Sequence, residues 1–281
     1  MKKFIALVLA MVMVLALCAC GNNNDNKDND SDASAKLKIL DSEYVTEDYA
    51  IGIAKENTAL LEKVNAALKE LKDDGTLKAV IDYFISGTGT LPEVQQNVAA
   101  DAEELVMATN ATFPPYESVD GDKIVGIDPT VAGLIADKLG MKLVINDMEF
   151  DAIIPALTSG KADIAMAGMT VNEERLQSIN FSDSYATGVQ VIIVKEDSDI
   201  TSADDIVAKI ENGENIQIGC QIVTTGYIYA SDTIENGGFG EDHVQAFPKG
   251  ADAIAALTSG KIDCVIIDNE PAKAFVEANN G

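Results

Sequence analysis

The sequence ALTSGKAD at residues 156–163 returns almost unchanged as ALTSGKID at residues 256–263. Apolar residues at helical spacing precede each copy, and each copy contains a glycine, Gly160 or Gly260, of the kind that ends helices in a left-handed conformation. A short apolar run typical of a buried strand follows each copy directly. A helix–strand unit therefore occurs twice, which predicts an α/β protein with two lobes, although such units also recur within other α/β proteins.

Potential site loops follow both predicted strands. The first strand leads into Gly168, Met169 and Thr170, and the second leads into Asp268. Because ligands of open parallel sheets bind at the carboxyl ends of the strands, both loops are candidates for a binding site. The pair Asp128–Pro129 predicts the start of another helix, with the aspartate as its N-cap.

Arg175 is the only arginine of the chain, and every other fixed cation is a lysine. It closes the stretch Ala167–Arg175, just after the first candidate loop. A guanidinium binds a planar carboxylate through two parallel hydrogen bonds, which lysine cannot reproduce. A site for a carboxylate ligand is therefore one interpretation, and an ordinary surface salt bridge is the other.

The N-terminus has the features of a bacterial lipoprotein signal. Lys2 and Lys3 precede the apolar run Phe4–Leu17, which is shorter than the roughly 20 residues that a membrane-spanning helix needs. The following LCAC sequence matches a lipobox with Cys20 as the lipidated residue. We expect residues 1–19 to be removed and the protein to be lipid-anchored to the cell membrane on its extracytoplasmic face; an uncleaved membrane anchor is the alternative.

Composition limits the remaining possibilities. Residues 20–36 are dominated by Asn, Asp, Ser and Lys and predict a disordered tether. The formal net charge of −26 repels nucleic acid, so no nucleic-acid partner is expected. The single histidine, His243, argues against a zinc site, and we expect no metal or cofactor. Cys220 and Cys264 lie in apolar runs and are predicted to be buried free thiols rather than a disulfide.

Several further stretches resemble one known family. Together with the Arg175 stretch and Ile267–Asp268, they are Ala108–Tyr116, Gly126–Asp128, Glu149–Leu157, Phe181–Tyr185 and Thr224–Gly226. The combination resembles the polar amino-acid-binding proteins of bacterial ABC importers, solute-binding protein family 3. The resemblance implies the type II periplasmic-binding fold, an α/β architecture of two lobes joined by a hinge.

The segments do not follow the order of that family. Before the first lobe, the chain carries a stretch that resembles the family's returning hinge strand and C-terminal helices, so we predict a circular permutation. We expect a fragment of lobe 2 at residues 37–47, the hinge strand and C-terminal helices of lobe 1 at 48–85, a joining linker at 86–103, the rest of lobe 1 at 104–192 and the rest of lobe 2 at 193–281.

The resemblance implies roles for individual residues. Arg175 would bind the α-carboxylate of an amino acid, and Asp268 would bind its α-ammonium. The family usually has glycine at the position of Val223, which weakens the expected backbone contact there. Further ligand contacts are implied for Gly168, Met169, Thr170, Thr224 and Thr225. The threonines could instead cap helices, and Asp268 could be a turn residue.

The side-chain end of the implied site contains aromatic and amide residues. Phe113 and Phe150 would form its walls, although both could belong to the core. Asn110 and Gln221 favour a neutral polar ligand such as glutamine over a basic one.

We therefore predict a monomeric, non-catalytic receptor that captures a free polar amino acid and delivers it to an ABC transporter permease. A dehydratase-like periplasmic enzyme and an amino-acid-sensing lipoprotein are the alternatives.

Overall fold

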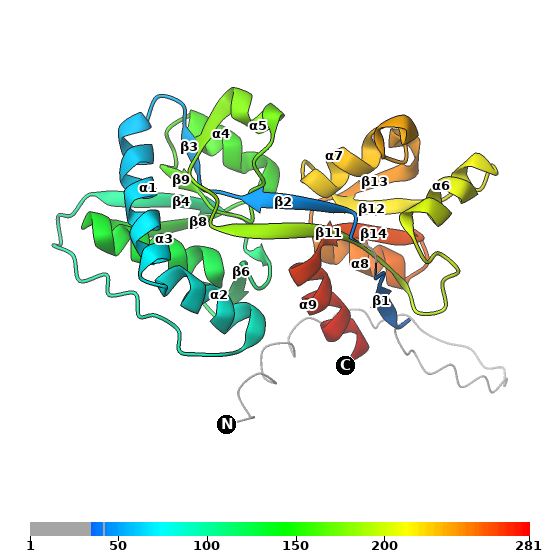
Figure 1. Ribbon diagram of the computed structural model, residues 1–281, viewed down its shortest axis with the longest axis horizontal. Helices are drawn as coiled ribbons and strands as arrows, with labels where there is room; N and C mark the ends of the chain where they lie inside the picture. Colours follow the sequence, from blue (N-terminus) through cyan, green and yellow to red (C-terminus); the bar gives the residue numbers. More distant parts are fainter. Residues whose placement is uncertain (1–34, 42) are drawn as a thin grey trace, which may run out of the picture.

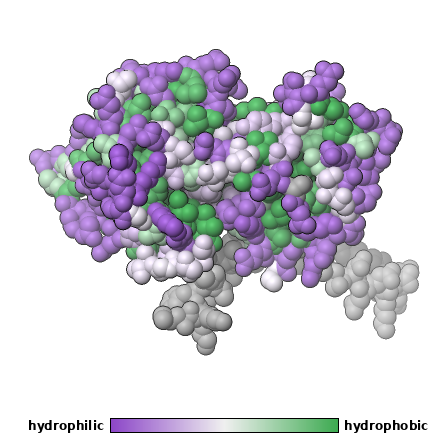
Figure 2. All heavy atoms as spheres, viewed as in Figure 1, coloured by the Kyte–Doolittle hydropathy of each residue, from purple (hydrophilic) through white to green (hydrophobic). Residues whose placement is uncertain are grey.

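The computed structural model describes residues 35–41 and 43–281. The predicted signal peptide, the lipidation site Cys20 and most of the predicted tether lie outside the described residues. The described chain forms two α/β lobes side by side, connected by strands β2 (Val45–Tyr49) and β11 (Ala186–Lys195) (Figure 1). Figure 2 shows hydrophilic residues over most of the visible face of both lobes. Across the described ranges, no helix is long and apolar enough to cross a membrane.

Lobe 1 is built around a mixed sheet with the strand order β10-β3-β9-β4-β8. Strand β4 runs parallel to β8 and β9, whereas β3 runs antiparallel to β9 and β10. Because β3 lies inside this sheet, the segment before residue 86 supplies an interior strand of lobe 1. The strands span Gly52–Ala54 (β3), Glu104–Thr109 (β4), Lys142–Asp147 (β8), Ile164–Ala165 (β9) and Ile179–Phe181 (β10).

Helices and a small separate sheet complete lobe 1. In α1, Leu60, Val64, Leu68 and Leu71 recur at helical spacing, and all four are buried in the same core cluster as β4. The helices are α1 (Thr58–Asp73), α2 (Thr76–Ser86), α3 (Ile127–Leu139), α4 (Ile153–Thr158) and α5 (Glu173–Ser178), with a 3-10 turn at Phe150–Ala152. The small sheet consists of β5 (Thr112–Phe113), β6 (Glu117–Asp120) and β7 (Lys123–Val125).

Lobe 2 is built around a sheet with the order β1-β11-β14-β12-β13, and β2 also pairs with β11. Cys220 and Cys264 are buried and free in this core, which confirms the predicted thiols. The strands are β1 (Leu37–Ile39), β12 (Ile218–Gln221), β13 (Val244–Phe247) and β14 (Cys264–Asp268). The helices are α6 (Ala203–Glu211), α7 (Thr225–Ser231), α8 (Gly250–Thr258) and α9 (Asn269–Asn280), with 3-10 turns at Ile234–Asn236 and Glu241–His243.

The repeated octapeptide occupies equivalent places in the two lobes. The first copy ends α4 and leads into β9, and the second ends α8 and leads into β14. Gly160 and Gly260 have φ angles of 70° and 72°, the left-handed conformation that glycine adopts most readily. The predicted helix–strand units are therefore confirmed.

The first and last described elements lie side by side in lobe 2, where Figure 1 draws β1 in blue and α9 in red. The backbone N–H of Leu37 donates to Asn280 Oδ1 over 2.9 Å, and Asn280 Nδ2 donates to the Leu37 carbonyl over 2.8 Å. The side chain of Asn279 also donates to the Ala35 carbonyl over 2.8 Å. The start of β1 is thus held by the last turn of α9.

Residues 87–103, between α2 and β4, form neither helix nor strand and lie against lobe 1. A Cβ on Gly133 of α3 would lie 2.6 Å from Val94 Cγ1, so the segment and the helix touch closely there. The backbone N–H of Gln96 donates to Asp137 Oδ1 over 2.7 Å, which ties the segment to the last turn of α3. The segment is therefore part of the packed surface of lobe 1.

The predicted N-cap role of Asp128 is wrong. Helix α3 begins at Ile127, with Gly126 as its N-cap, so Asp128 lies inside the first turn. Its carboxylate instead accepts the N–H of Gly168 over 3.0 Å and the hydroxyl of Tyr185 over 2.7 Å. Asp128 therefore hydrogen-bonds to residues distant in the sequence instead of capping its own helix, and the local sequence does not reveal these contacts.

Gly126→Ala is expected to destabilise the protein far more than Gly121→Ala. Both glycines have positive φ, but a Cβ on Gly126 would lie 2.2 Å from the Tyr116 carbonyl oxygen, whereas one on Gly121 meets nothing within 4 Å. Backbone strain alone costs about 1–2 kcal/mol, and the additional backbone clash raises the cost at Gly126 to about 3 kcal/mol or more. Urea unfolding measures both variants; equal losses of stability would contradict this packing.

Candidate functional site

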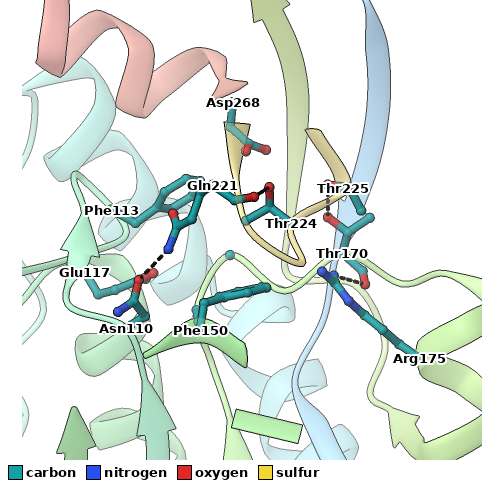
Figure 3. A pocket seen from close by; sticks show the side chains of 12 residues that line it. Asn110, Phe113, Glu117, Phe150, Thr170, Arg175, Gln221, Thr224, Thr225 and Asp268 are labelled. Carbon is teal, nitrogen blue, oxygen red and sulfur yellow. Dashed lines mark hydrogen bonds between the residues drawn. The ribbon is translucent and has the colours of Figure 1, made fainter. Parts of the chain in front are cut away.

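A cavity lies between the two lobes, at the carboxyl ends of several strands (Figure 3). Ten of the eleven residues predicted for the ligand line it, and Met169 is the exception. Met169 packs in the lobe 1 core, and its carbonyl accepts the N–H of Ala50 over 3.1 Å. The lining residues are Asn110, Phe113, Glu117, Phe150, Ala167, Gly168, Thr170, Arg175, Gln221, Thr224, Thr225 and Asp268.

Arg175 is buried at one end of this cavity, with 5% of its surface exposed. Helix α5 positions it, and Asn172 caps that helix by accepting the N–H of Arg175 itself over 2.8 Å. Its guanidinium donates to the carbonyls of Thr170 (2.8 Å) and Val223 (3.2 Å). Within the described residues, none of the ion pairs includes Arg175. Burial lowers its pKa, and a buried cation without an anion is costly.

Asp268 faces the cavity from lobe 2, at the end of β14. Its carboxylate accepts a hydrogen bond from the hydroxyl of Tyr49, which lies on β2. Burial, followed by the negative charge of Glu47, raises the pKa of Asp268 to about 7. A cationic ligand group beside Asp268 would favour its ionised form.

The two lobes touch each other across the cavity. Asn110 of lobe 1 accepts a hydrogen bond from Gln221 Nε2 over 3.0 Å, and the hydroxyls of Thr170 and Thr225 lie 3.4 Å apart (Figure 3). The bond from Arg175 to the Val223 carbonyl also joins the lobes. The structure therefore represents a closed arrangement of the lobes.

Glu47 links the hinge strands to both lobes. It is 5% exposed, and its Oε2 accepts from Gln190 Nε2 (2.9 Å) on β11 and from Thr170 Oγ1 (3.2 Å) in lobe 1. Gln190 Nε2 also lies 3.4 Å from Thr225 Oγ1 in lobe 2. This network makes the position of Thr170 and Thr225 depend on the hinge.

Two of the groups predicted to contact the ligand already form hydrogen bonds within the protein. The N–H of Gly168 donates to Asp128, and the hydroxyl of Thr224 donates to the Gln221 carbonyl over 2.7 Å. Thr224 is also the N-cap of α7, as the alternative interpretation predicted. Val223, in place of the usual glycine, has a φ of 64°, a strained conformation for a β-branched residue.

Aromatic rings enclose the middle of the cavity. Phe150 lies under the guanidinium of Arg175, with 5.4 Å between Cζ and the ring centroid. Phe113 covers Gly168, where a Cβ would lie 2.8 Å from Phe113 Cε1, so glycine is required for this approach. The rings form apolar walls between the two polar ends of the cavity (Figure 3).

Glu117, at the start of β6, is a lining residue that the sequence analysis missed. It is fully buried, and neither carboxylate oxygen has an N–H or O–H donor among the described residues. Burial raises its pKa well above the ordinary value, and the neighbouring charge of Asp128 adds to this rise. The sequence contained one indication of this position, because Glu117 directly follows Ala108–Tyr116, one of the stretches that resemble the family.

Comparison with known proteins identifies the family of the chain. Residues 105–254, more than half of the sequence, match the bacterial extracellular solute-binding proteins, family 3. The chain belongs to this family. Solved structures of two-lobe amino-acid-binding proteins that resemble it confirm the type II fold, as predicted.

Individual relatives of this solute-binding protein have been named for basic amino acids. The arginine-binding extracellular protein ArtP of Bacillus subtilis (strain 168) is 30% identical over 63% of this chain and 66% of its own length. The arginine-bound form of truncated ArgBP from T. maritima is 39% identical, with a TM-score of 0.55, over 63% of this chain and 78% of that one. The arginine-, lysine-, histidine-binding protein ArtJ from Geobacillus stearothermophilus is 31% identical, with a TM-score of 0.56, over 63% and 72%. The chain thus spans about two thirds of ArtP.

Asp268→Asn is expected to stabilise the ligand-free protein and to weaken binding of an α-ammonium group. The native pKa of about 7 lies above the ordinary value of 3.8, so ionisation of Asp268 opposes folding progressively as the pH rises between these values. The melting temperature of the variant should exceed that of the wild type by a few degrees at pH 7.5 and by less at pH 5.

Asp122→Asn, in the exposed turn between β6 and β7, is the matched control and should leave the melting temperature unchanged. A D268N variant that melts below the wild type at both pH values would contradict the assigned burial of this carboxylate.

Proposed function

We propose that this protein is an extracytoplasmic receptor that captures a free amino acid with a cationic side chain, arginine above all, and delivers it to an ABC transporter permease. The observation that carries the proposal is the buried guanidinium of Arg175, which faces a cavity without a carboxylate partner among the described residues. An α-carboxylate would supply that partner.

The backbone of an α-amino acid matches the charges that the two lobes present. Arg175 of lobe 1 would bind the carboxylate, and Asp268 of lobe 2 would bind the ammonium, across the same cavity (Figure 3). Removing both ligand charges from water is favourable only when each meets an opposite charge. Because the partners come from different lobes, a zwitterion would stabilise the closed arrangement.

The side-chain end of the cavity favours a hydrogen-bond donor with positive charge. Glu117 lines this end and offers two buried carboxylate oxygens that accept from no N–H or O–H group of the described residues. The amide of Asn110 is engaged, because its Nδ2 donates to the Met148 carbonyl and its Oδ1 accepts from Gln221. A guanidinium carries donors only, so it fits these acceptors better than the amide of glutamine, which the sequence favoured.

The names of the relatives support the same ligand class, since ArtP and ArgBP are arginine-binding and ArtJ also binds lysine and histidine. These relatives are binding proteins, and no observation favours the dehydratase-like alternative. We further propose that the protein acts as a monomer and that lipid on Cys20 anchors it to the membrane.

Calorimetry and thermal shift with arginine, lysine, histidine, glutamine and glutamate test the ligand class. Arginine is expected to bind most tightly; with micromolar affinity, about 1 mM arginine would raise the melting temperature by about 10 °C. Agmatine, which is arginine without its carboxylate, should bind at least about tenfold more weakly because Arg175 would remain unpaired. Equal binding of agmatine and arginine, or a response to glutamine alone, would refute the proposed ligand.

We also propose that the chain is a circular permutant of the family fold. The family match begins at residue 105, whereas the earlier segment supplies β3 inside the lobe 1 sheet and β1 beside β11 in lobe 2. The hydrogen bonds between Leu37 and Asn280 support direct continuation from α9 into β1.

A reordered chain, in which residues 104–281 are followed by residues 37–85, tests the permutation. It should fold and bind arginine within about threefold of the original chain, because every strand of both large sheets and every residue that lines the cavity is retained. Calorimetry on both chains makes the comparison. A reordered chain that folds with normal helix content but binds no amino acid would argue against the permutation.

A further inference from the structure

Two carboxyl groups lie near each other at the side-chain end of the cavity, because the backbone N–H of Asp128 donates over 3.0 Å to the carbonyl of Tyr116, the residue before Glu117. Glu117 belongs to β6 and Asp128 to the first turn of α3, and both are fully buried. Asp128 accepts two ordinary hydrogen bonds, from the Gly168 N–H and the Tyr185 hydroxyl. Glu117 lines the cavity, and within the described chain its oxygens accept from no N–H or O–H group.

Among the described residues, no lysine or arginine forms an ion pair with either carboxyl group. The ion pairs of the described residues include neither Glu117 nor Asp128, and Arg175 lies toward the opposite end of the cavity (Figure 3). The remaining titratable groups that act on the pair are carboxyls or phenols: Asp147 at the end of β8, Asp268 of lobe 2, and the buried Tyr116 and Tyr185. None of them compensates a negative charge.

Adjacent buried carboxylates without a cation cannot both be ionised. Burial, followed by the negative charge of Asp128, raises the pKa of Glu117 well above its ordinary value, and burial raises the pKa of Asp128 to about 6. Asp128 has the other donors that stabilise a carboxylate, so Glu117 is the group that holds the proton.

We propose that Glu117 is a neutral acid in the ligand-free protein and that capture of a basic amino acid expels its proton to solvent. The O–H bond of the acid breaks, the proton leaves to water, and the carboxylate pairs with the ligand cation. The net charge of the cavity is therefore unchanged by the arriving side chain. This inference rests on the proposed function, and it gives the site a means to select charge: a neutral side chain leaves Glu117 protonated.

Proton exchange at Asp268 must be separated from this step, because the α-ammonium of any amino acid favours ionisation there. With a pKa of about 7, Asp268 is mostly ionised at pH 8, so its share of proton release is small at that pH. Citrulline, the neutral isostere of arginine, carries the same α-ammonium and serves as the matched ligand control.

Isothermal calorimetry measures how many protons are released on binding, because the binding enthalpy depends on the ionisation enthalpy of the buffer. The measurement is made at pH 8 in phosphate and in Tris. Arginine should release more protons than citrulline, and in Glu117→Gln this difference should fall to about zero. Below the pKa of Glu117, arginine affinity should decrease about tenfold for each unit of pH beyond the loss shown by citrulline.

Infrared difference spectroscopy on the wild type provides a readout that needs no variant: the band of a protonated carboxyl should disappear when arginine is added. Arginine binding without proton release and without loss of that band would overturn this inference and leave the proposed function intact. Absence of arginine binding would overturn both.

Discussion

The structure depends on the buried positive charge of Arg175, which forms no ion pair among the described residues. The guanidinium of Arg175 is almost wholly buried, and it is held by backbone carbonyls of Thr170 and Val223 rather than by an anion. Carbonyl groups satisfy part of its hydrogen-bonding capacity but supply no net negative charge. The cavity beside it is therefore a place where an anionic group lowers the free energy.

Buried carboxyl groups outnumber this cation around the cavity. Asp268 and Glu117 line the cavity, whereas Asp128 and Glu47 hydrogen-bond to residues that line it, Gly168 and Thr170. A ligand with one negative and two positive groups complements this arrangement better than a neutral side chain does. The hinge takes part as well, because Glu47 and Tyr49 of β2 hydrogen-bond to residues from both lobes. Occupation of the cavity and closure of the lobes are thus coupled through shared hydrogen bonds.

The sequence was informative wherever a local pattern carries the structural role. The octapeptide repeat predicted both helix–strand units, and the post-strand loops predicted where Thr170, Arg175 and Asp268 gather. Local patterns failed where a side chain acts at a distance. Asp128 has the sequence context of a helix cap, but it accepts hydrogen bonds from Gly168 and Tyr185, which are distant in the sequence. Glu47 and Tyr49 were missed because they reach the site only through the pairing of β2 with β11. Glu117 was missed because its significance comes from burial, which sequence does not show.

A crystal structure with bound arginine tests the central claim most directly. The account predicts that the ligand carboxylate forms two hydrogen bonds to the guanidinium of Arg175, at about 2.7–2.9 Å, while the ammonium contacts Asp268 from the other lobe. A ligand bound with its carboxylate away from Arg175, or a complex in which Arg175 keeps only its bonds to backbone carbonyls, would contradict it.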